Sequence, residues 1–197
     1  MVRIMIKNYD REQIRTGEHS LSVHEAKQLL SKCEDFTEKM LLRTAMNTGI
    51  RRSDIARLSW KNIDFEERSI TYYESKKDKT RTIYVSESLI NELKQLRSIH
   101  KDEYYCFPGR SGKKYGKGHI SSKTAYNVFQ RNLEAAGLSR RPFHSLRATC
   151  VKLCQSNGWS VEQTAKHIGD TVRVVQEHYA TPSVSEMREL SEEKQIL

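Results

Sequence analysis

Two short runs of alternating side chains, residues 69–75 and 80–86, interrupt a chain whose other apolar residues recur every three or four positions. Both runs are rich in β-branched and aromatic residues and place Ile70 and Tyr72 on one face, which predicts two strands. The SKKDK segment between them predicts a hairpin tip. Apolar residues at helical spacing on both sides of the hairpin predict helices. We therefore expect an α+β fold that is mainly helical, with one small antiparallel sheet.

Capping residues set the expected ends of several helices. Ser22 with Glu25, and Ser160 with Gln163, have the spacing of capping boxes, which satisfy the free N–H groups of a first helical turn. Gly49 follows an apolar helical pattern and predicts the end of that helix. The expected helices begin at Ser22 and then cover residues 36–48, a short segment with Ile55 and Leu58, 86–99, 121–136, 144–157, 160–168 and 171–179.

The length of 197 residues corresponds to one ordinary domain with short tails. Residues 1–20 are polar and lack periodicity, so they predict an N-terminal arm or the remnant of a linker. Residues 21–182 hold the strong periodic patterns and predict the folded domain. The tail, residues 183–197, has Met187 and Leu190 at helical spacing and fits a final helix.

The chain has 34 Lys and Arg residues against 25 Asp and Glu residues, which gives a formal net charge of +9. Such a charge favours a polyanionic partner, nucleic acid first, although good solubility alone is the other explanation. The candidate DNA contacts lie in the hairpin and in a glycine-rich loop and are Lys77, Lys79, Arg81, Arg110, Lys113, Lys114 and Lys117. No run of 18 apolar residues exists, so we expect no membrane segment, and a location in the cytoplasm or wherever the target DNA lies.

The four cysteines do not have the pattern of a disulfide framework, and none lies in a CxxC motif. Cys150 and Cys154 are four residues apart and would share one face of a helix, where they need only be small buried hydrophobic residues. We therefore predict no metal site. The chain also lacks a P-loop and a dinucleotide-binding glycine motif, so we predict no cofactor.

Three segments contain residues suited to phosphate chemistry. NTGIRRSDIARLSW contains Arg51, PFHSLRATC contains His144 and Arg147, and AKHIGDTVRVVQEHYA contains Tyr179. They resemble the TGxRxxE, HxxR and LGHxxxxxTxxxY boxes of the tyrosine recombinase, or phage integrase, family, including the tyrosine ten residues after a glycine. The hairpin, ESKKDKTRTIYV, is similar to that family's β-hairpin lysine segment. The resemblance covers about residues 20–182 and implies an integrase-type catalytic domain.

The resemblance implies a role for each matching residue. Tyr179 would be the nucleophile that forms a 3′-phosphotyrosine, and adjacent cations would favour its phenolate. Arg51 and Arg147 would hold the phosphate, since planar guanidinium groups bind two oxygens in forked geometry. His144, with an ordinary pKa of about 6.5, can exchange a proton at neutral pH. Lys76 would protonate the departing 5′ oxygen, and no ATP, metal or organic cofactor is required.

Each of these residues also has a simpler explanation, and for His144 and Arg147 it is a pair at a helix N-terminus without function. Arg51 fits a solvated surface arginine, and Lys77 and Lys79 are rivals of Lys76 for the lysine role. Tyr179 continues an apolar helical stripe and fits a core tyrosine. The four boxes in order favour catalysis over these separate explanations.

Asp170 is the main departure from the family pattern, which usually has histidine at that position. An ionised aspartate cannot donate a hydrogen bond and repels a phosphate. Asp170 fits a cap for the helix that leads to Tyr179, or a partner that orients an arginine or histidine. His167, three residues upstream, is a candidate for the missing donor. In the first box, Asp54 stands in the place of glutamate.

The sequence therefore predicts a site-specific recombinase that binds double-stranded DNA and forms a tetramer on it, with the tail bridging subunits. Type IB topoisomerase-like activity is one alternative, because it uses the same chemistry to relax supercoils. A DNA-binding regulator that keeps the fold without cutting is the other, and Asp170 favours it. Family members usually carry a helical core-binding domain first, so the chain is either a minimal recombinase or a catalytic fragment.

Overall fold

A computed structural model describes residues 19–101, 103–109, 118–179 and 191–192 of the chain. Most of the predicted tail and most of the predicted N-terminal arm lie outside the described residues. So do four of the candidate DNA contacts, Arg110, Lys113, Lys114 and Lys117. In the part of the chain that is described, no helix is long and apolar enough to cross a membrane.

Eight α-helices and one three-stranded sheet form the described part of the chain, which confirms a mainly helical α+β fold. The helices are α1 (Val23–Lys32), α2 (Phe36–Thr48), α3 (Arg52–Ala56), α4 (Glu87–Ile99), α5 (Ser122–Ala135), α6 (Ser145–Ser156), α7 (Val161–Ile168) and α8 (Val172–His178). The predicted short helix is α3, which carries Ile55 but ends before Leu58, although both side chains are buried. A 3-10 turn, η2 (Trp60–Asn62), then leads into the sheet.

Helix ends follow the side chains that the sequence places there. Both predicted capping boxes, on α1 and α7, are present. Gly49 ends α2 in the left-handed region, with φ of 63°, and its N–H donates to the carbonyl of Ala45. A Cβ at Gly49 would lie 3.0 Å from Cγ2 of Ile168. The glycine therefore ends α2 and also allows the last turn of α7 to pack against that end.

The sheet is antiparallel, with its three strands in the order β1 (Ile63–Asp64), β2 (Ser69–Glu74) and β3 (Lys79–Tyr84). β1 is absent from the predicted elements because two residues are too few to show an alternating pattern. Glu74 pairs with Lys79, so Lys79 begins a strand instead of belonging to the hairpin tip. Ile70 and Tyr72 are buried on one face, as predicted, and Glu74 follows them with 0% of its surface exposed.

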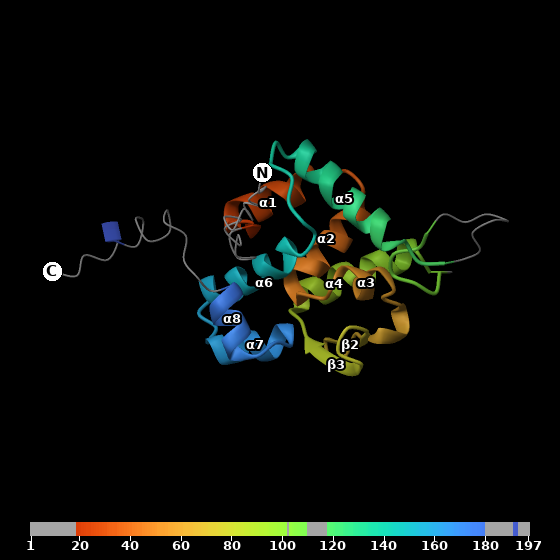
Figure 1. Cartoon of the computed structure of the whole chain (residues 1–197). Coiled ribbons are helices and arrows are strands. Elements are labelled where there is room, and N and C mark those ends of the chain that lie inside the picture. Colours follow the sequence, from red (N-terminus) through yellow and green to blue (C-terminus); the bar gives the residue numbers. More distant parts are fainter. Residues whose placement is uncertain (1–18, 102, 110–117, 180–190, 193–197) are drawn as a thin grey trace, which may run out of the picture.

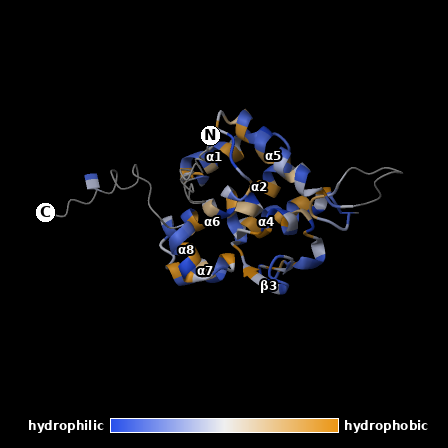
Figure 2. Cartoon of the chain, in the orientation of Figure 1, coloured by the Kyte–Doolittle hydropathy of each residue, from blue (hydrophilic) through white to orange (hydrophobic). Residues whose placement is uncertain are grey.

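Helix α2 lies at the centre of the helical part and contacts α1, α4, α5 and α6 (Figure 1). Apolar side chains form two clusters, a larger one that joins α1–α5 with the sheet and a smaller one among α6, α7 and α8. In Figure 2, apolar positions gather where the helices face one another, and hydrophilic positions face outward. The smaller cluster includes Tyr179, so packing against α6 and α7 holds the residue that follows α8.

Candidate active site

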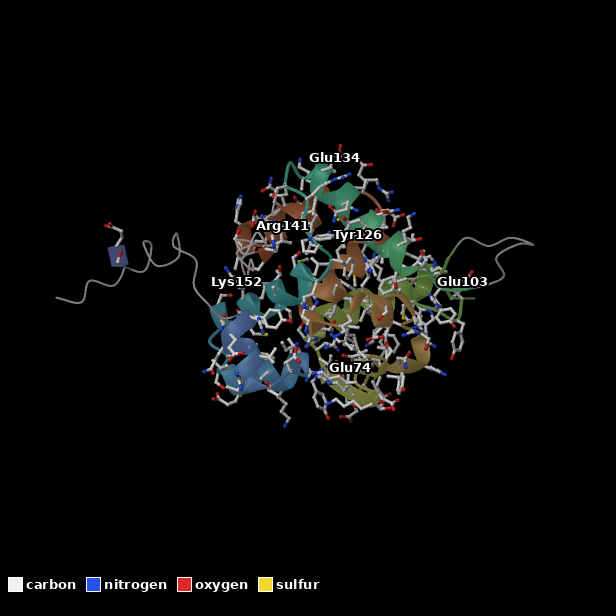
Figure 3. All side chains as sticks on the ribbon, in the orientation of Figure 1. Glu74, Glu103, Tyr126, Glu134, Arg141 and Lys152 are labelled. Carbon is white, nitrogen blue, oxygen red and sulfur yellow. The ribbon has the colours of Figure 1, made fainter. Side chains whose placement is uncertain are left out.

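A cavity of about 400 Å³ lies beside the start of α3, the hairpin tip and the start of α6. Four of the residues that line it were singled out by the sequence: Arg51, Lys76, His144 and Arg147. Arg52 also lines the cavity, and its guanidinium lies 5.8 Å from the ring centroid of Tyr126 on α5, which Figure 3 labels. Basic groups from three separate segments therefore converge on one cavity.

Arg51 precedes α3 and forms an ion pair with Glu74, the last residue of β2. The Arg51 side chain is 16% exposed, whereas that of Glu74 is 0% exposed. The buried carboxylate of Glu74 therefore holds the Arg51 guanidinium in position. Arg51 is therefore not a solvated surface arginine. Glu74 is not among the residues predicted from the sequence, although its position on the apolar face of the strand was a signal, because a buried carboxylate needs a cationic partner. Figure 3 shows Glu74 at the sheet.

Arg147 is only 3% exposed and joins the end of α2 to the segment after α7. Its Nη1 donates to the Gly49 carbonyl at 2.7 Å, and its Nη2 donates to Oδ2 of Asp170 at 2.6 Å. Its Nε has no hydrogen-bond partner among the described residues. A guanidinium has five N–H donors, so these two bonds leave it with capacity for another acceptor.

Asp170 does not cap α8, as one of its predicted roles required, because the side chain of Thr171 accepts the hydrogen bond from the Val174 N–H. Asp170 instead orients Arg147, as the other predicted role required, and also binds Lys77, with Oδ1 2.6 Å from Nζ. Burial by itself would raise the pKa of the Asp170 carboxyl, but the hydrogen bonds from Lys77 and Arg147 outweigh it and the pKa is lowered. The carboxylate is therefore ionised at neutral pH.

The three candidate lysines of the hairpin have different surroundings. Lys77 is tied to Asp170 and also donates to the carbonyl of Gly169 at 2.5 Å. Lys79 is an exposed residue of β3. Lys76 lines the cavity and has no ion-pair partner in the described part of the chain. The geometry therefore favours Lys76 over its two rivals.

Asp54, which stands in the place of the glutamate of the first box, binds the hairpin tip. It is 4% exposed and accepts a hydrogen bond of 2.6 Å from Ser75 Oγ, one residue before Lys76. It also forms an ion pair with Arg57 at 3.0 Å. A carboxylate at this position therefore links α3 to the hairpin tip.

His144 lies one residue before α6, and its Nε2 is 2.8 Å from the hydroxyl oxygen of Tyr179 at the end of α8. Burial, with added repulsion from Arg147 and Arg51, lowers the pKa of His144 to about 4. The imidazole is therefore neutral at pH 7, and one ring nitrogen can accept the phenolic proton. This contact therefore allows His144 to accept the proton of the Tyr179 hydroxyl.

Tyr179 is 5% exposed, packs in the smaller apolar cluster and is not among the residues that line the cavity. Its pKa is raised, because the effect of burial exceeds the opposing effect of Arg147. Arg147 and Arg51 favour the phenolate, as expected, but burial outweighs them, so in this conformation the tyrosine is protonated and its hydroxyl depends on a base. Tyr179 is thus a packed tyrosine and a partner of His144 at once.

Arg81 is engaged within the protein. Its Nη1 donates to the carbonyl of Ile168 at 2.6 Å, and its Nη2 donates to the carbonyls of Lys166 and His167. An added Cβ at Gly169, whose φ is 75°, would lie 1.3 Å from Arg81 Nη1, so a larger residue there would be strained and would displace the guanidinium from these carbonyls. Because the Arg81 guanidinium already donates to three carbonyls at the end of α7, Arg81 is not among the proposed DNA contacts.

His167 does not take the place of the missing histidine. Its Nε2 is 2.8 Å from the carbonyl oxygen of Asn47, and its ring lies edge-on to Trp159. It lines a different cavity from the one that contains Arg51 and Arg147. The suggestion that it donates to a phosphate beside Asp170 is therefore wrong.

The sequence and fold match known proteins. The chain is 28% identical over 135 residues to the integrase of Salmonella phage P22, which is 66% of this chain and 35% of that protein. It is 22% identical over 179 residues to the tyrosine recombinase XerA of Pyrococcus horikoshii, which is 90% of this chain and 62% of that protein.

Two solved structures share the fold. The crystal structure of XerA recombinase matches with a TM-score of 0.75 at 20% identity, over 90% of this chain and 64% of that one. A lambda integrase dimer bound to a COC′ core site matches with a TM-score of 0.63 at 17% identity, over 84% of this chain and 62% of that one. The chain thus spans less than two thirds of the length of each of these relatives. The model of the phage integrase family matches residues 19–183, and the chain belongs to this family.

Proposed function

We propose that the protein is a site-specific DNA recombinase that cuts and rejoins duplex DNA through a 3′-phosphotyrosine. The observation that carries this proposal is the 2.8 Å contact between His144 and the Tyr179 hydroxyl, next to a cavity lined by Arg51 and Arg147. The contact pairs a base with a nucleophile, and the cavity offers cations for the phosphate that would be attacked.

The scissile phosphate would lie in the cavity, held by Arg51 and Arg147. Two acidic residues keep these cations in place, because Glu74 binds Arg51 and Asp170 binds Arg147. Each guanidinium keeps free donors for the nonbridging oxygens, which gain negative charge as the nucleophile attacks. Asp170 therefore acts as a positioning residue, which explains how an anion can lie in a phosphate-binding site.

Neutral His144 would take the proton of Tyr179 as the phenolic oxygen attacks phosphorus. The bond between Tyr179 and phosphorus forms while the bond to the 5′ oxygen breaks, and Lys76 gives that oxygen a proton. Tyr179 does not line the cavity in this conformation, but its hydroxyl is 2.8 Å from His144, which does, so attack requires the hydroxyl to turn into the cavity when DNA binds. A second 5′ hydroxyl then reverses the steps and joins a new strand without a cofactor.

Double-stranded DNA is the proposed partner, with self-association on DNA. Solved relatives include a lambda integrase dimer on a core site and a lambda integrase tetramer on a Holliday junction. Lys77 and Lys79 on the exposed side of the hairpin, together with the basic loop outside the described residues, are the proposed contacts to other phosphates. The tail, residues 183–197, is the proposed bridge between subunits.

One observation favours the alternative of a regulator that binds DNA without cutting it, namely the burial of Tyr179 at 5% exposure. A recombinase forms a covalent protein–DNA intermediate, whereas a regulator that only binds DNA does not. A nicked duplex that loses its short 5′ fragment after cleavage traps the covalent intermediate, because no strand remains to reverse the reaction. We would present a random-sequence pool of such duplexes to the full chain and recover DNA that remains attached after denaturation.

Recovery of covalent DNA from the wild type, and none from Tyr179→Phe, is the expected result. A wild-type protein that binds the pool but never forms an adduct would leave the regulator as the better explanation. Recovered sites would then be tested in pairs for strand exchange. Relaxation of a supercoiled plasmid without exchange would indicate topoisomerase-like activity instead.

A further inference from the structure

A second group of reactive side chains lies where α6 packs on α7, outside the residues that line the proposed phosphate site. Cys150 and Cys154 are four residues apart on α6, so both project from one helical face. His167 reaches the same place from α7. The two sulfur atoms and a ring nitrogen all lie within 4.8 Å of one another. The proposed recombination chemistry uses none of these groups.

One ring nitrogen of His167 keeps a lone pair that can bind a ligand. Its Nε2 is 2.8 Å from the carbonyl oxygen of Asn47, and a carbonyl can only accept, so this nitrogen carries the ring proton. In a neutral imidazole, the other nitrogen, Nδ1, then keeps its lone pair. A histidine that ligates a metal usually donates its second ring N–H to a carbonyl or carboxylate in this way.

The three side chains also line a common cavity. Cys150 and Cys154 are 1% and 8% exposed, and together with His167 they line a cavity of about 310 Å³. All four cysteines of the chain are free thiols, so neither sulfur is held in a disulfide. The cavity leaves room for an ion to enter and for a water molecule beside it.

We propose that Cys150, Cys154 and His167 bind a zinc ion, with water from the cavity as the fourth ligand. Zinc prefers thiolate and imidazole ligands in a tetrahedron, at about 2.3 Å from sulfur and about 2.0 Å from nitrogen. Ligand atoms within 4.8 Å of one another need only small side-chain rotations to reach that geometry. Binding releases the two thiol protons to solvent as the two zinc–sulfur bonds form.

A bound ion would connect α6 to α7, the two elements that place Arg147 and Asp170. Arg147 of α6 and Asp170, which follows α7, form an ion pair of 2.6 Å that joins the same two helices. Zinc would therefore stabilise the helix pair that positions Arg147. This consequence is separate from DNA cleavage, so the site can be tested whether or not the proposed function is correct.

The test uses the full chain, reduced and freed of metal with a chelator, and titrated first with Co²⁺ and then with Zn²⁺. Cobalt is the spectroscopic probe, since thiolate ligands give it a charge-transfer band that disappears when zinc displaces it. We expect one equivalent of cobalt to bind. With zinc at about one hundred times its dissociation constant, we expect the melting temperature to rise by roughly 5 °C or more.

Cys154→Ala and His167→Gln should each weaken zinc binding at least about tenfold, in line with the loss of one ligand. The glutamine amide can still donate to the Asn47 carbonyl, so His167→Gln keeps the helix contact and separates ligand loss from unfolding. Cys33→Ala is the matched control, because Cys33 is a free cysteine at the C-terminal end of α1 and does not line the cavity that contains Cys150, Cys154 and His167. Absence of a charge-transfer band in the wild type, or equal binding by the wild type and both folded ligand variants, would overturn the proposal.

Discussion

Replacing Asp170 by alanine tests whether this residue holds Arg147 in place. The Arg147 side chain is 2% exposed and that of Asp170 is 11% exposed, so the change leaves a buried guanidinium without its anionic partner. Breaking a buried pair in this way costs about 3–5 kcal/mol. Because Asp170 retains some exposure, we take the lower end, about 3 kcal/mol, which for a chain of this size lowers the melting temperature by roughly 6–12 °C.

Lys77→Ala is the matched control, since it removes the other partner of the same carboxylate. The Lys77 side chain is 32% exposed, so its ion pair should contribute less than about 1 kcal/mol. The assay is urea unfolding of both variants and the wild type at pH 7. A loss below about 1 kcal/mol for Asp170→Ala, or a loss no larger than that of Lys77→Ala, would refute the positioning role.

The pH dependence provides a second check on Asp170. Its folded-state pKa is lowered below 3.8, the ordinary value for an aspartate, so the charged form is favoured in the folded protein. The stability that this carboxylate contributes is therefore fully present above 3.8 and is lost as the pH falls through the lowered folded pKa. The difference between wild type and Asp170→Ala should stay constant from pH 7 down to the unfolded pKa and shrink only below it.

Four further outcomes follow from the proposed active site. Tyr179→Phe should abolish the covalent adduct and change DNA affinity less than about threefold, since only one hydroxyl is lost; this is measured by denaturing gels and by gel shift. Arg51→Lys and Arg147→Lys should each slow single-turnover cleavage by about a hundredfold or more, because lysine cannot make forked contacts, and a loss below about threefold would contradict phosphate binding by that residue. Cleavage should be level from pH 7 to 5 and decrease only toward a pKa of about 4, where His144 becomes protonated, whereas a decrease near pH 6.5 would contradict its lowered pKa. DNA affinity should decrease with salt with a logarithmic slope of about −5 if about six phosphates are contacted, and a slope shallower than about −2 would mean that most of the basic residues are only solvated.

Most of the secondary structure and the main candidate residues could be predicted from the sequence. Helix positions follow from apolar spacing, and helix ends follow from Ser22, Ser160 and Gly49, because these signals act between residues three or four positions apart. The hairpin follows from its period of two. Arg51, His144 and the other box residues could be named because their spacing in the chain is characteristic, even without knowledge of their surroundings.

The tertiary structure alone decided what surrounds those residues. Glu74 is paired with Arg51, Arg81 holds the end of α7, and Asp170 binds Arg147, although each pair is more than 20 positions apart in the sequence. Ion pairs and hydrogen bonds of this kind depend on distances in space, which local patterns do not encode.

The ionisation states and the proposed zinc site have the same physical origin. Burial of Tyr179 raises its pKa and burial of His144 lowers its pKa, and the extent of burial is set by how α6, α7 and α8 pack together. The sequence showed Cys150 and Cys154 on one helical face and predicted no metal site, since neither lies in a CxxC motif. Only the packing of α7 on α6 brings His167 to those sulfur atoms, and a ligand set assembled from two helices exists only once the chain has folded.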